Sequence, residues 1–345
     1  MLNNIKFSVL LVSLFSAVPT YAHHSFAATF SEEIITVEGT VERFKYSNPH
    51  VIVYFNVIDE EGKETQWLAE GGSATSMRNQ GWDRDTLSEG DYIRITGPST
   101  RNGSPMVSMQ EDDSVTFVDP ATGEVVGAPG AASVEKEGVF NMALQLPNGL
   151  PNFSSAWTGE ATGRVGRPIL HVPPMDYNEI GAALQAEFDP INDPQVQCEP
   201  PGLVRQAGFS PHPVRIEQYD DHVVLRYEEY AGLRTVYFDD RDLVGGEHTH
   251  LGQSIARYEG QNLIIETSHL LPNLSATTGN PLTDQTTTVE TYYRQDKPNG
   301  RAVLRLDLVA TDLGYLLTPW TISWSKYAEN DYEFIKVECE KPLTN

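Results

Sequence analysis

The chain has 345 residues, with 48 Asp and Glu against 24 Lys and Arg, and a formal net charge of −24. A field of that sign repels phosphate backbones and anionic headgroups, which argues against nucleic-acid binding and against an electrostatic membrane anchor. Hydrophobic residues make up 39% of the chain, which is enough for packed cores, and two cysteines exclude a disulfide-dense mini-fold and a Cys-based zinc module.

Residues 1–22 predict a secretory signal peptide. Lys6 supplies the positive charge, and residues 7–17 form an apolar run too short to cross a bilayer core of about 30 Å. Residues 20–22 place small side chains at a cleavage site, and a short membrane anchor is the alternative. No later apolar run reaches the ~18 residues of a spanning helix, so we expect a periplasmic or secreted protein with no integral membrane segment after cleavage.

Residues 23–109 predict a small β barrel. The order strand, strand, strand, helix, strand, strand is that of an OB-type barrel, and a small β-sandwich is the alternative. Ser73 is the expected N-cap of the helix, and Gly81 is expected at its C-terminal end. The predicted elements are strands at residues 35–46, 51–58, 65–70, 91–97 and 105–109, with the helix at residues 73–80.

Residues 110–138 are rich in Pro, Gly and acidic side chains and predict a linker. In the next part, residues 139–345, an extended lead-in with one helix at 178–188 precedes eight or nine antiparallel strands at about 213–337. A meander of that size favours closure into an up-and-down barrel, because closure removes exposed edges. In one of its strands Leu304, Leu306 and Leu308 are expected to point inward, with Arg305 and Asp307 outward.

The first block contains the motifs His23-His24-Ser25-Phe26-Ala27, Asn48-Pro49-His50, Gly81-Trp82-Asp83-Arg84-Asp85-Thr86-Leu87 and Gly90-Asp91. With these motifs, residues 22–109 resemble the DUF6152 family of exported bacterial proteins. The second block contains Cys198-Glu199-Pro200-Pro201-Gly202-Leu203, the segment at residues 251–260 and Pro319-Trp320-Thr321. With these motifs it resembles an uncharacterised lipocalin-like domain of the same bacteria, in which the position of Gln253 is usually His. Together the resemblances imply an all-β protein with an OB-like barrel and a lipocalin-like antiparallel barrel, and they imply no reaction.

The two cysteines, Cys198 and Cys339, are expected to form a disulfide, because an exported protein meets an oxidising compartment. Two buried free thiols are the alternative.

Cleavage after Ala22 would make His23 the mature N-terminus, whose α-amine and imidazole can both bind one metal ion. With His50 as a third ligand this is a histidine brace, which suits copper, and His24 competes for the same role. The alternative is a flexible His-His tail together with a His50 that is hydrogen-bonded in a turn.

Six aromatic residues of the second block are expected to line a cavity for an apolar ligand, with plain core packing as the alternative. They are Tyr227, Tyr237, Tyr258, Tyr292, Trp320 and Trp324. Consecutive acidic residues such as Glu228-Glu229 point to opposite faces of a strand, so we expect them on a solvated surface.

The sequence has no Gly-x-Ser-x-Gly, His-Glu-x-x-His or P-loop motif, so no catalytic residue is assigned. The leading interpretation is an exported binding protein, with an apolar small molecule in the second barrel and copper at the mature N-terminus. The alternatives are a hydratase or isomerase that acts on an apolar substrate in the barrel cavity, and a structural envelope protein.

Overall fold

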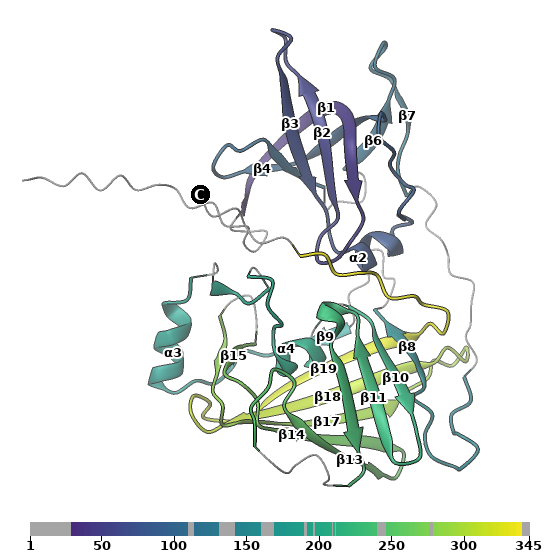
Figure 1. Ribbon diagram of the computed structural model, residues 1–345, viewed down its shortest axis with the longest axis vertical. Helices are drawn as coiled ribbons and strands as arrows, with labels where there is room; N and C mark the ends of the chain where they lie inside the picture. Colours follow the sequence, from purple (N-terminus) through teal and green to yellow (C-terminus); the bar gives the residue numbers. More distant parts are fainter. Residues whose placement is uncertain are drawn as a thin grey trace, which may run out of the picture.

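The computed structural model describes residues 29–109, 114–130, 142–159, 169–189, 192–195, 197–208, 210, 212–239, 246–275 and 279–339. Within these residues the protein is all-β, as predicted, and consists of a five-stranded and a nine-stranded closed barrel (Figure 1). The predicted signal peptide, His23 and His24 lie outside the described residues. None of the described helices is both long enough and apolar enough to cross a membrane.

The first barrel has the strand order β1-β2-β3-β5-β4 and closes through the β1–β4 pairing, with β3 and β5 parallel. This is the predicted OB-type order, and α2 falls between β3 and β4 with Ser73 as its N-cap. The elements are β1 (Phe30–Lys45), β2 (Ile52–Ile58), β3 (Glu64–Glu70), α2 (Ala74–Asn79), β4 (Tyr92–Thr100) and β5 (Met106–Ser108).

Closure of this barrel depends on β1, which pairs with β4 over its first part and with β2 over its last. The change of partner occurs near Gly39, where a Cβ would lie 2.4 Å from the Asn56 carbonyl oxygen. Only glycine allows that approach, and the register shift follows between Val41 and Arg43.

The segment at 110–138 is more than the predicted linker. It contains β6 (Val115–Val118), which pairs with β4, and β7 (Val125–Gly127), which pairs with β6. These short strands extend the first sheet beyond the closed barrel. The sequence patterns missed them because the segment is rich in turn-forming residues, which are uncommon in strands.

The second barrel closes in the order β18-β17-β14-β13-β12-β11-β10-β8-β19, with β9 paired to the edge of β19. It differs from the predicted meander in two respects: β8 comes from the lead-in, and β12 pairs with β13 in parallel. The strands are β8 (Ser155–Thr158), β9 (Ile169–His171), β10 (Val214–Gln218), β11 (His222–Tyr227), β12 (Leu233–Tyr237), β13 (Gln253–Glu259), β14 (Asn262–Ser268), β17 (Thr286–Arg294), β18 (Val303–Asp312) and β19 (Trp320–Ala328). The remaining elements are α3 (Glu179–Ala186), α4 (Leu203–Gly208), η2 (Glu229–Ala231) and the pair β15 (Asn273–Leu274) and β16 (Pro281–Leu282).

The alternation predicted for β18 is confirmed. Leu304, Leu306 and Leu308 are fully buried, while Arg305 and Asp307 are partly exposed. The wholly buried helix α4 packs on β18 and β19, and its Ala207 carbonyl accepts a hydrogen bond of 2.7 Å from Trp324 Nε1. A Cβ on Gly208 would lie 2.7 Å from Ile322 Cδ1, so the helix lies directly against the barrel strands.

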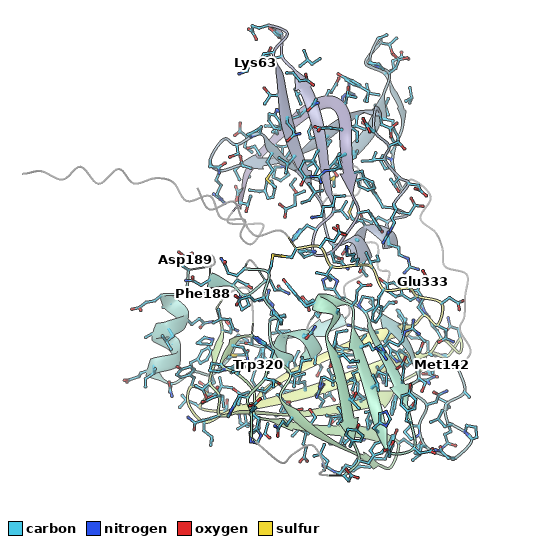
Figure 2. The ribbon with its side chains drawn as sticks, viewed as in Figure 1. Lys63, Met142, Phe188, Asp189, Trp320 and Glu333 are labelled. Atoms are coloured by element: carbon cyan, nitrogen blue, oxygen red, sulfur yellow. A yellow bond between two sulfur atoms is a disulfide. The ribbon has the colours of Figure 1, made fainter. Side chains whose placement is uncertain are left out.

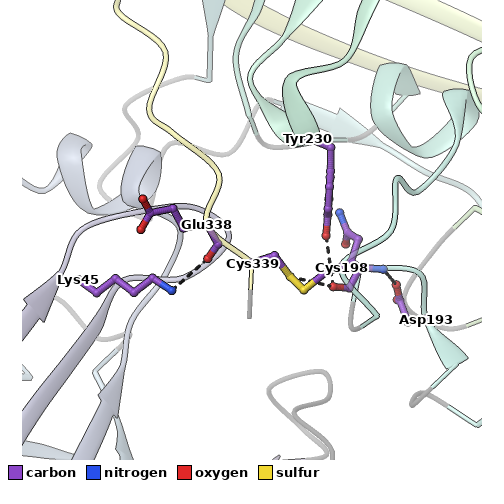
Figure 3. The surroundings of a disulfide bond; sticks show 7 residues. Lys45, Asp193, Cys198, Tyr230, Glu338 and Cys339 are labelled. Atoms are coloured by element: carbon purple, nitrogen blue, oxygen red, sulfur yellow. Dashed lines mark hydrogen bonds between the residues drawn. A yellow bond between two sulfur atoms is a disulfide. The ribbon is translucent and has the colours of Figure 1, made fainter. Parts of the chain in front are cut away.

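A C-terminal strap, residues 329–339, runs from the second barrel across the first. Its Ile335 belongs to the core of the first barrel, and Lys45 Nζ donates to the Glu338 carbonyl at 3.1 Å (Figure 3). The predicted disulfide is confirmed: Cys198 and Cys339 are bonded, with their Cα atoms 5.6 Å apart, and this bond fastens the end of the strap (Figure 3).

Beneath the strap lies Glu228, which is 2% exposed and not on the predicted solvated surface. Its Oε1 accepts hydrogen bonds from Asn48 Nδ2 at 2.9 Å and Thr75 Oγ1 at 2.6 Å. Its Oε2 accepts from Tyr332 OH and from the Ile335 backbone N–H. Glu229 is also buried, and its Oε1 accepts a hydrogen bond from Gln195 Nε2. The expectation of exposure therefore fails for both residues, and for Glu228 the reason is that the first barrel and the strap cover it.

Lys63 marks the tip of the β2–β3 hairpin, which points away from the second barrel, while the labelled Trp320 lies within that barrel (Figure 2).

Candidate functional site

One joint of the second barrel is weaker than the others. Where β12 meets β13, the described residues form a single register pair, Tyr237 with Ile255, and the strands are parallel. Beside that pair the two strands leave a pocket of about 480 Å³, which we call the seam pocket. The described residues that line it are Leu233, Arg234, Thr235, Val236, Thr249, His250, Leu251, Gly252, Gln253 and Ser254.

The loop before β13 is held in place by backbone bonds and by one glycine. Thr249 N donates to the His269 carbonyl at 3.0 Å, and Leu271 N donates back to the Thr249 carbonyl at 3.0 Å. Gly252 has a φ of +66°, and a Cβ there would lie 2.5 Å from the Ser268 carbonyl oxygen. Because glycine tolerates both the conformation and the contact, the loop can approach β14 and leave the pocket open.

Arg234 spans the seam with its side chain where the backbone pairing is missing. Its Nη2 donates to Ser254 Oγ on β13 at 2.9 Å and to Thr267 Oγ1 on β14 at 3.0 Å. Its Nη1 donates to Tyr227 OH at 3.0 Å and to Glu290 Oε1 at 3.1 Å. One guanidinium group therefore links five strands of the barrel.

Arg234 and Glu290 form a buried ion pair, with side chains 3% and 0% exposed. Burial alone would lower the pKa of Arg234, but the Glu290 carboxylate and Tyr227 hold that pKa above its usual value. Burial also raises the pKa of Tyr227 to about 12, and the pKa of Tyr292, whose hydroxyl donates to Glu290, well above 10. At neutral pH both tyrosines therefore keep their protons and the arginine keeps its charge, so Tyr227 OH accepts from Arg234 while Tyr292 OH donates to Glu290.

Some polar atoms at the seam have no hydrogen-bond partner among the residues that the structure describes. They are Arg234 Nε, a donor, and Gln253 Oε1, an acceptor, both from residues that line the seam pocket. A buried polar atom without a partner costs about 1–3 kcal/mol, which a bound polar group would offset. The arrangement suits a ligand that can both accept and donate a hydrogen bond.

The structure brings together three of the six predicted ligand-binding aromatics. Tyr227 and Tyr292 meet at the Arg234–Glu290 pair, and the Trp324 ring lies edge-on to Tyr292 with centroids 6.2 Å apart. All three are buried, and they form the wall of the barrel interior next to the ion pair.

The other three predicted aromatics lie apart from this group. Trp320 is buried, with its Nε1 donating to the Pro173 carbonyl at 2.7 Å. Tyr258 is partly buried against Phe238, and Tyr237 lies with its ring 5.3 Å from that of His222. None of the six predicted residues is among those that line the seam pocket.

Of the three predicted metal ligands, only His50 is described. Its Nδ1 lies 3.1 Å from the Gly71 carbonyl oxygen and 3.0 Å from Glu70 Oε1, and its side chain is 45% exposed. The described part of the chain has no group of three or more His, Cys, Asp or Glu residues arranged to hold a metal ion. His23 and His24 lie outside that part.

The sequence patterns missed Arg234, Ser254 and Glu290 as site residues. A signal for Glu290 was present, because it lies two positions before Tyr292 in β17 and therefore shares its inward face. A charged residue on the inward face of a barrel strand is rare and indicates a buried partner.

The comparisons with known proteins concern the first barrel alone. No curated protein matches the chain. One family model does, over residues 11–108, and that range ends at the last residue of β5, where the closed five-stranded barrel ends. The N-terminal part of this chain therefore matches the family described as "Family of unknown function (DUF6152)".

Proposed function

We propose that this protein is an exported binding protein whose second, lipocalin-like barrel holds one small molecule in the seam pocket. The observation that carries the proposal is a pocket of about 480 Å³ whose lining residues include Arg234 and Gln253, each with a buried polar atom that lacks a partner among the described residues. Ligand sites of this kind combine apolar walls with a few polar groups that fix the orientation of the ligand.

The lining defines the chemistry of the ligand. Leu233, Val236 and Leu251 supply apolar contacts, while Arg234 Nε offers a donor and Gln253 Oε1 an acceptor. A hydroxyl group satisfies both, because it accepts and donates at one oxygen. The ligand is therefore a small, mostly apolar molecule with one hydroxyl group.

The test uses p-cresol and its hydroxyl-free analogue toluene as probes, with binding measured by calorimetry. We expect p-cresol to bind about tenfold more tightly, as one hydrogen bond to a charged group predicts. Gln253→Leu should reduce the difference in affinity between p-cresol and toluene. Leu251→Trp should fill the pocket and abolish binding of both probes. Gln66→Leu, in the first barrel, is the matched control and should bind as the wild type does.

Native mass spectrometry of protein purified from the compartment to which it is exported gives the second measurement. A co-purifying small molecule that Leu251→Trp lacks supports the proposal. Absence of both that molecule and p-cresol binding overturns the proposal in favour of a structural envelope role. Conversion of a bound alkene or enone overturns it in favour of a hydratase or isomerase.

A second candidate function, copper binding by His23, His24 and His50, is favoured by the orientation of His50. Its Nδ1 is held by the Gly71 carbonyl and the Glu70 carboxylate, so Nε2 is the nitrogen left for a metal. Metal-binding histidines commonly have their second ring nitrogen fixed in this way, by a carbonyl or a carboxylate.

The chain before β1 is long enough to reach His50. Phe30 pairs with Thr100 on β4, which neighbours β5 and then β3, where Glu70 contacts His50. Three strand spacings make about 15 Å, whereas residues 23–29 span up to about 24 Å when extended.

Copper titration by calorimetry tests this second function on protein that begins at His23. His50→Ala and an added N-terminal Gly should each weaken binding at least tenfold, and Glu70→Gln should weaken it about tenfold. His222→Ala, a histidine on the second barrel, is the control and should leave binding unchanged. Equal copper binding by all of these proteins would show that the brace is wrong.

A further inference from the structure

A second pocket lies on the outer wall of the second barrel, at the tip of the β17–β18 hairpin. Its volume is about 290 Å³, and we call it the outer pocket. In the register of β18 and β19, Val303 faces Tyr327 and Arg305 faces Ser325, and all four point away from the barrel interior. The described lining residues are Gln295, Asp296, Lys297, Pro298, Val303, Arg305, Ser325 and Tyr327.

The outer pocket is basic in a chain whose net charge is −24. Lys297 and Arg305 line it, and Arg301 stacks on the Tyr327 ring, with its Cζ 3.7 Å from the ring centroid. At physiological salt, charges beyond about 8 Å are largely screened, so the side chains close to the pocket influence the potential inside it more than the net charge of the chain does.

The acidic residue of the lining, Asp296, is already neutralised. Arg294 Nε donates to its Oδ1 at 2.8 Å, and Arg294 Nη2 donates to its Oδ2, in a pair whose side chains are 5% and 19% exposed. The Val303 backbone N–H also donates to Oδ1, at 3.1 Å. Among the lining residues, the charges left for a ligand are therefore those of Lys297 and Arg305.

Arg305 also has a hydrogen-bond donor that a ligand could use. Its Nε is buried and has no hydrogen-bond partner within the described part of the chain. Guanidinium groups bind carboxylates in short, charge-assisted hydrogen bonds, and the planar shapes of the two groups match. The walls beside Arg305, formed by Val303, Pro298 and Tyr327, are mostly apolar.

We propose that the outer pocket is a binding site for a small organic carboxylate. The carboxylate accepts hydrogen bonds from Arg305 and pairs with the Lys297 ammonium, while its organic part packs on Val303, Pro298 and Tyr327. A volume of about 290 Å³ lies at the small end of ligand pockets and fits a molecule of the size of benzoate. This site is separate from the seam pocket, which lies between β12 and β13.

The test compares benzoate with benzamide, which has nearly the same shape and no charge, and with inorganic phosphate. Binding to the full chain is measured by calorimetry at physiological salt. We expect benzoate to bind at least tenfold more tightly than benzamide, as a charge-assisted pair predicts, and more tightly than phosphate, which lacks the apolar part.

Variants locate the site. Arg305→Gln should weaken benzoate binding about tenfold and Lys297→Gln about threefold, whereas Arg226→Gln, on the outer face of β11, should not change it. Because Lys297 is exposed, its variant remains informative if Arg305→Gln fails to fold. Leu251→Trp, which fills the seam pocket, should leave benzoate binding intact.

Three outcomes would overturn the proposal. They are equal binding of benzoate and benzamide, tighter binding of phosphate than of benzoate, and an equal effect of Arg226→Gln and Arg305→Gln on benzoate binding.

Discussion

Two buried glutamates of the second barrel are stabilised in opposite ways. Glu290 faces the guanidinium of Arg234, so its charge is balanced by a full positive charge within the same barrel. Glu228 accepts hydrogen bonds from uncharged donors, of which Asn48 and Thr75 belong to the first barrel and Tyr332 to the strap. The imidazole of His212 has its Nδ1 3.5 Å from Glu228 Oε1.

The difference shows two uses of a buried carboxylate. An ion pair needs one partner, and here it fixes the Arg234 guanidinium, which also bonds to Ser254 across the seam that a single backbone pair leaves weak. A carboxylate held by several separate donors requires all the donors to arrive together, and here they come from the first barrel and the strap. Glu228 thus fixes how the barrels sit together, while Glu290 supports the pocket.

The largest expected effect concerns the strap that covers Glu228. Replacing both cysteines, Cys198→Ser with Cys339→Ser, opens a loop with a sequence separation of 141 residues. The chain-entropy model predicts a loss of about 4–5 kcal/mol in the free energy of unfolding. Urea unfolding of the oxidised wild type and of the double variant measures it.

Reductant supplies the control for that experiment. It should lower the stability of the wild type toward that of the double variant and leave the double variant unchanged. A double variant as stable as the oxidised wild type would mean that the other contacts of the strap suffice.

The next prediction concerns the ion pair of Glu290. Arg234→Met should lower the free energy of unfolding by about 3–5 kcal/mol, because it leaves the Glu290 carboxylate buried without its cation. Adding Glu290→Leu should recover most of that loss, since the remaining apolar residues have no charge to balance. A double variant less stable than Arg234→Met alone would contradict this explanation, because the cost of Arg234→Met would then not come from the unpaired carboxylate.

Glu228→Gln sharpens the comparison through pH. The change keeps the shape but removes the charge that four donors share, so we expect a loss of about 2–3 kcal/mol in the free energy of unfolding at pH 7. Burial pushes the pKa of Glu228 up, but the nearby His212 imidazole and the hydrogen bonds from Thr75, Tyr332 and the Ile335 backbone hold that pKa below the usual 4.5.

The sign of the pH effect follows from that lowered pKa. The stabilisation by Glu228 is complete above the unfolded pKa of about 4.5 and is lost as the pH falls through the folded pKa. The gap between wild type and Glu228→Gln should therefore be constant from pH 7 to about pH 5 and close in more acidic solution. Glu217→Gln, whose partner Arg226 is at the surface, should show neither the loss nor the pH trend.

The smallest effect near neutral pH concerns Lys326, which donates to the Ser210 and His212 carbonyl oxygens close to Glu228. Burial lowers its pKa to about 7, despite the opposing fields of Glu229 and Glu228. Unfolding then takes up a proton between pH 7 and the unfolded pKa of about 10.5, so the wild type gains stability as the pH rises through that window.

Lys326→Met removes this titration. Relative to the variant, the wild type should gain roughly 1 kcal/mol per pH unit above pH 7, with a flat difference below pH 7. Lys63→Met, at an exposed hairpin tip, is the control and should stay flat throughout. A trend in the opposite direction would make Lys326 the counterion of Glu228 and remove the contrast with Glu290.

The elements that the sequence predicts best are those with local signals. The OB-type order follows from strand alternation and from the turn at 59–63, and the N-cap of α2 from Ser73. The missed elements depend on distant partners: β8 is four residues long and is fixed by pairing with β10 and β19. No local pattern marks such a segment as a barrel strand.

The burial of the two glutamates differs in the same way. The burial of Glu290 can be predicted from its position two residues before Tyr292, on the inward face of β17. Glu228 is not, because its burial depends on Asn48 and Tyr332, which are far from it in the sequence. Sequence patterns show which face of a strand a side chain takes, and they do not show which remote segment covers that face.

The strap also affects the order in which parts of the chain reach their final packing. Lys45 and Glu338 are 293 residues apart, and Ile335 completes the core of a barrel whose strands leave the ribosome first. Contacts over such separations form late, because a long loop must close, at a cost in chain entropy, before the contacts can stabilise the fold. The first barrel therefore reaches its final packing only after β19 has been made, although its own strands were complete long before.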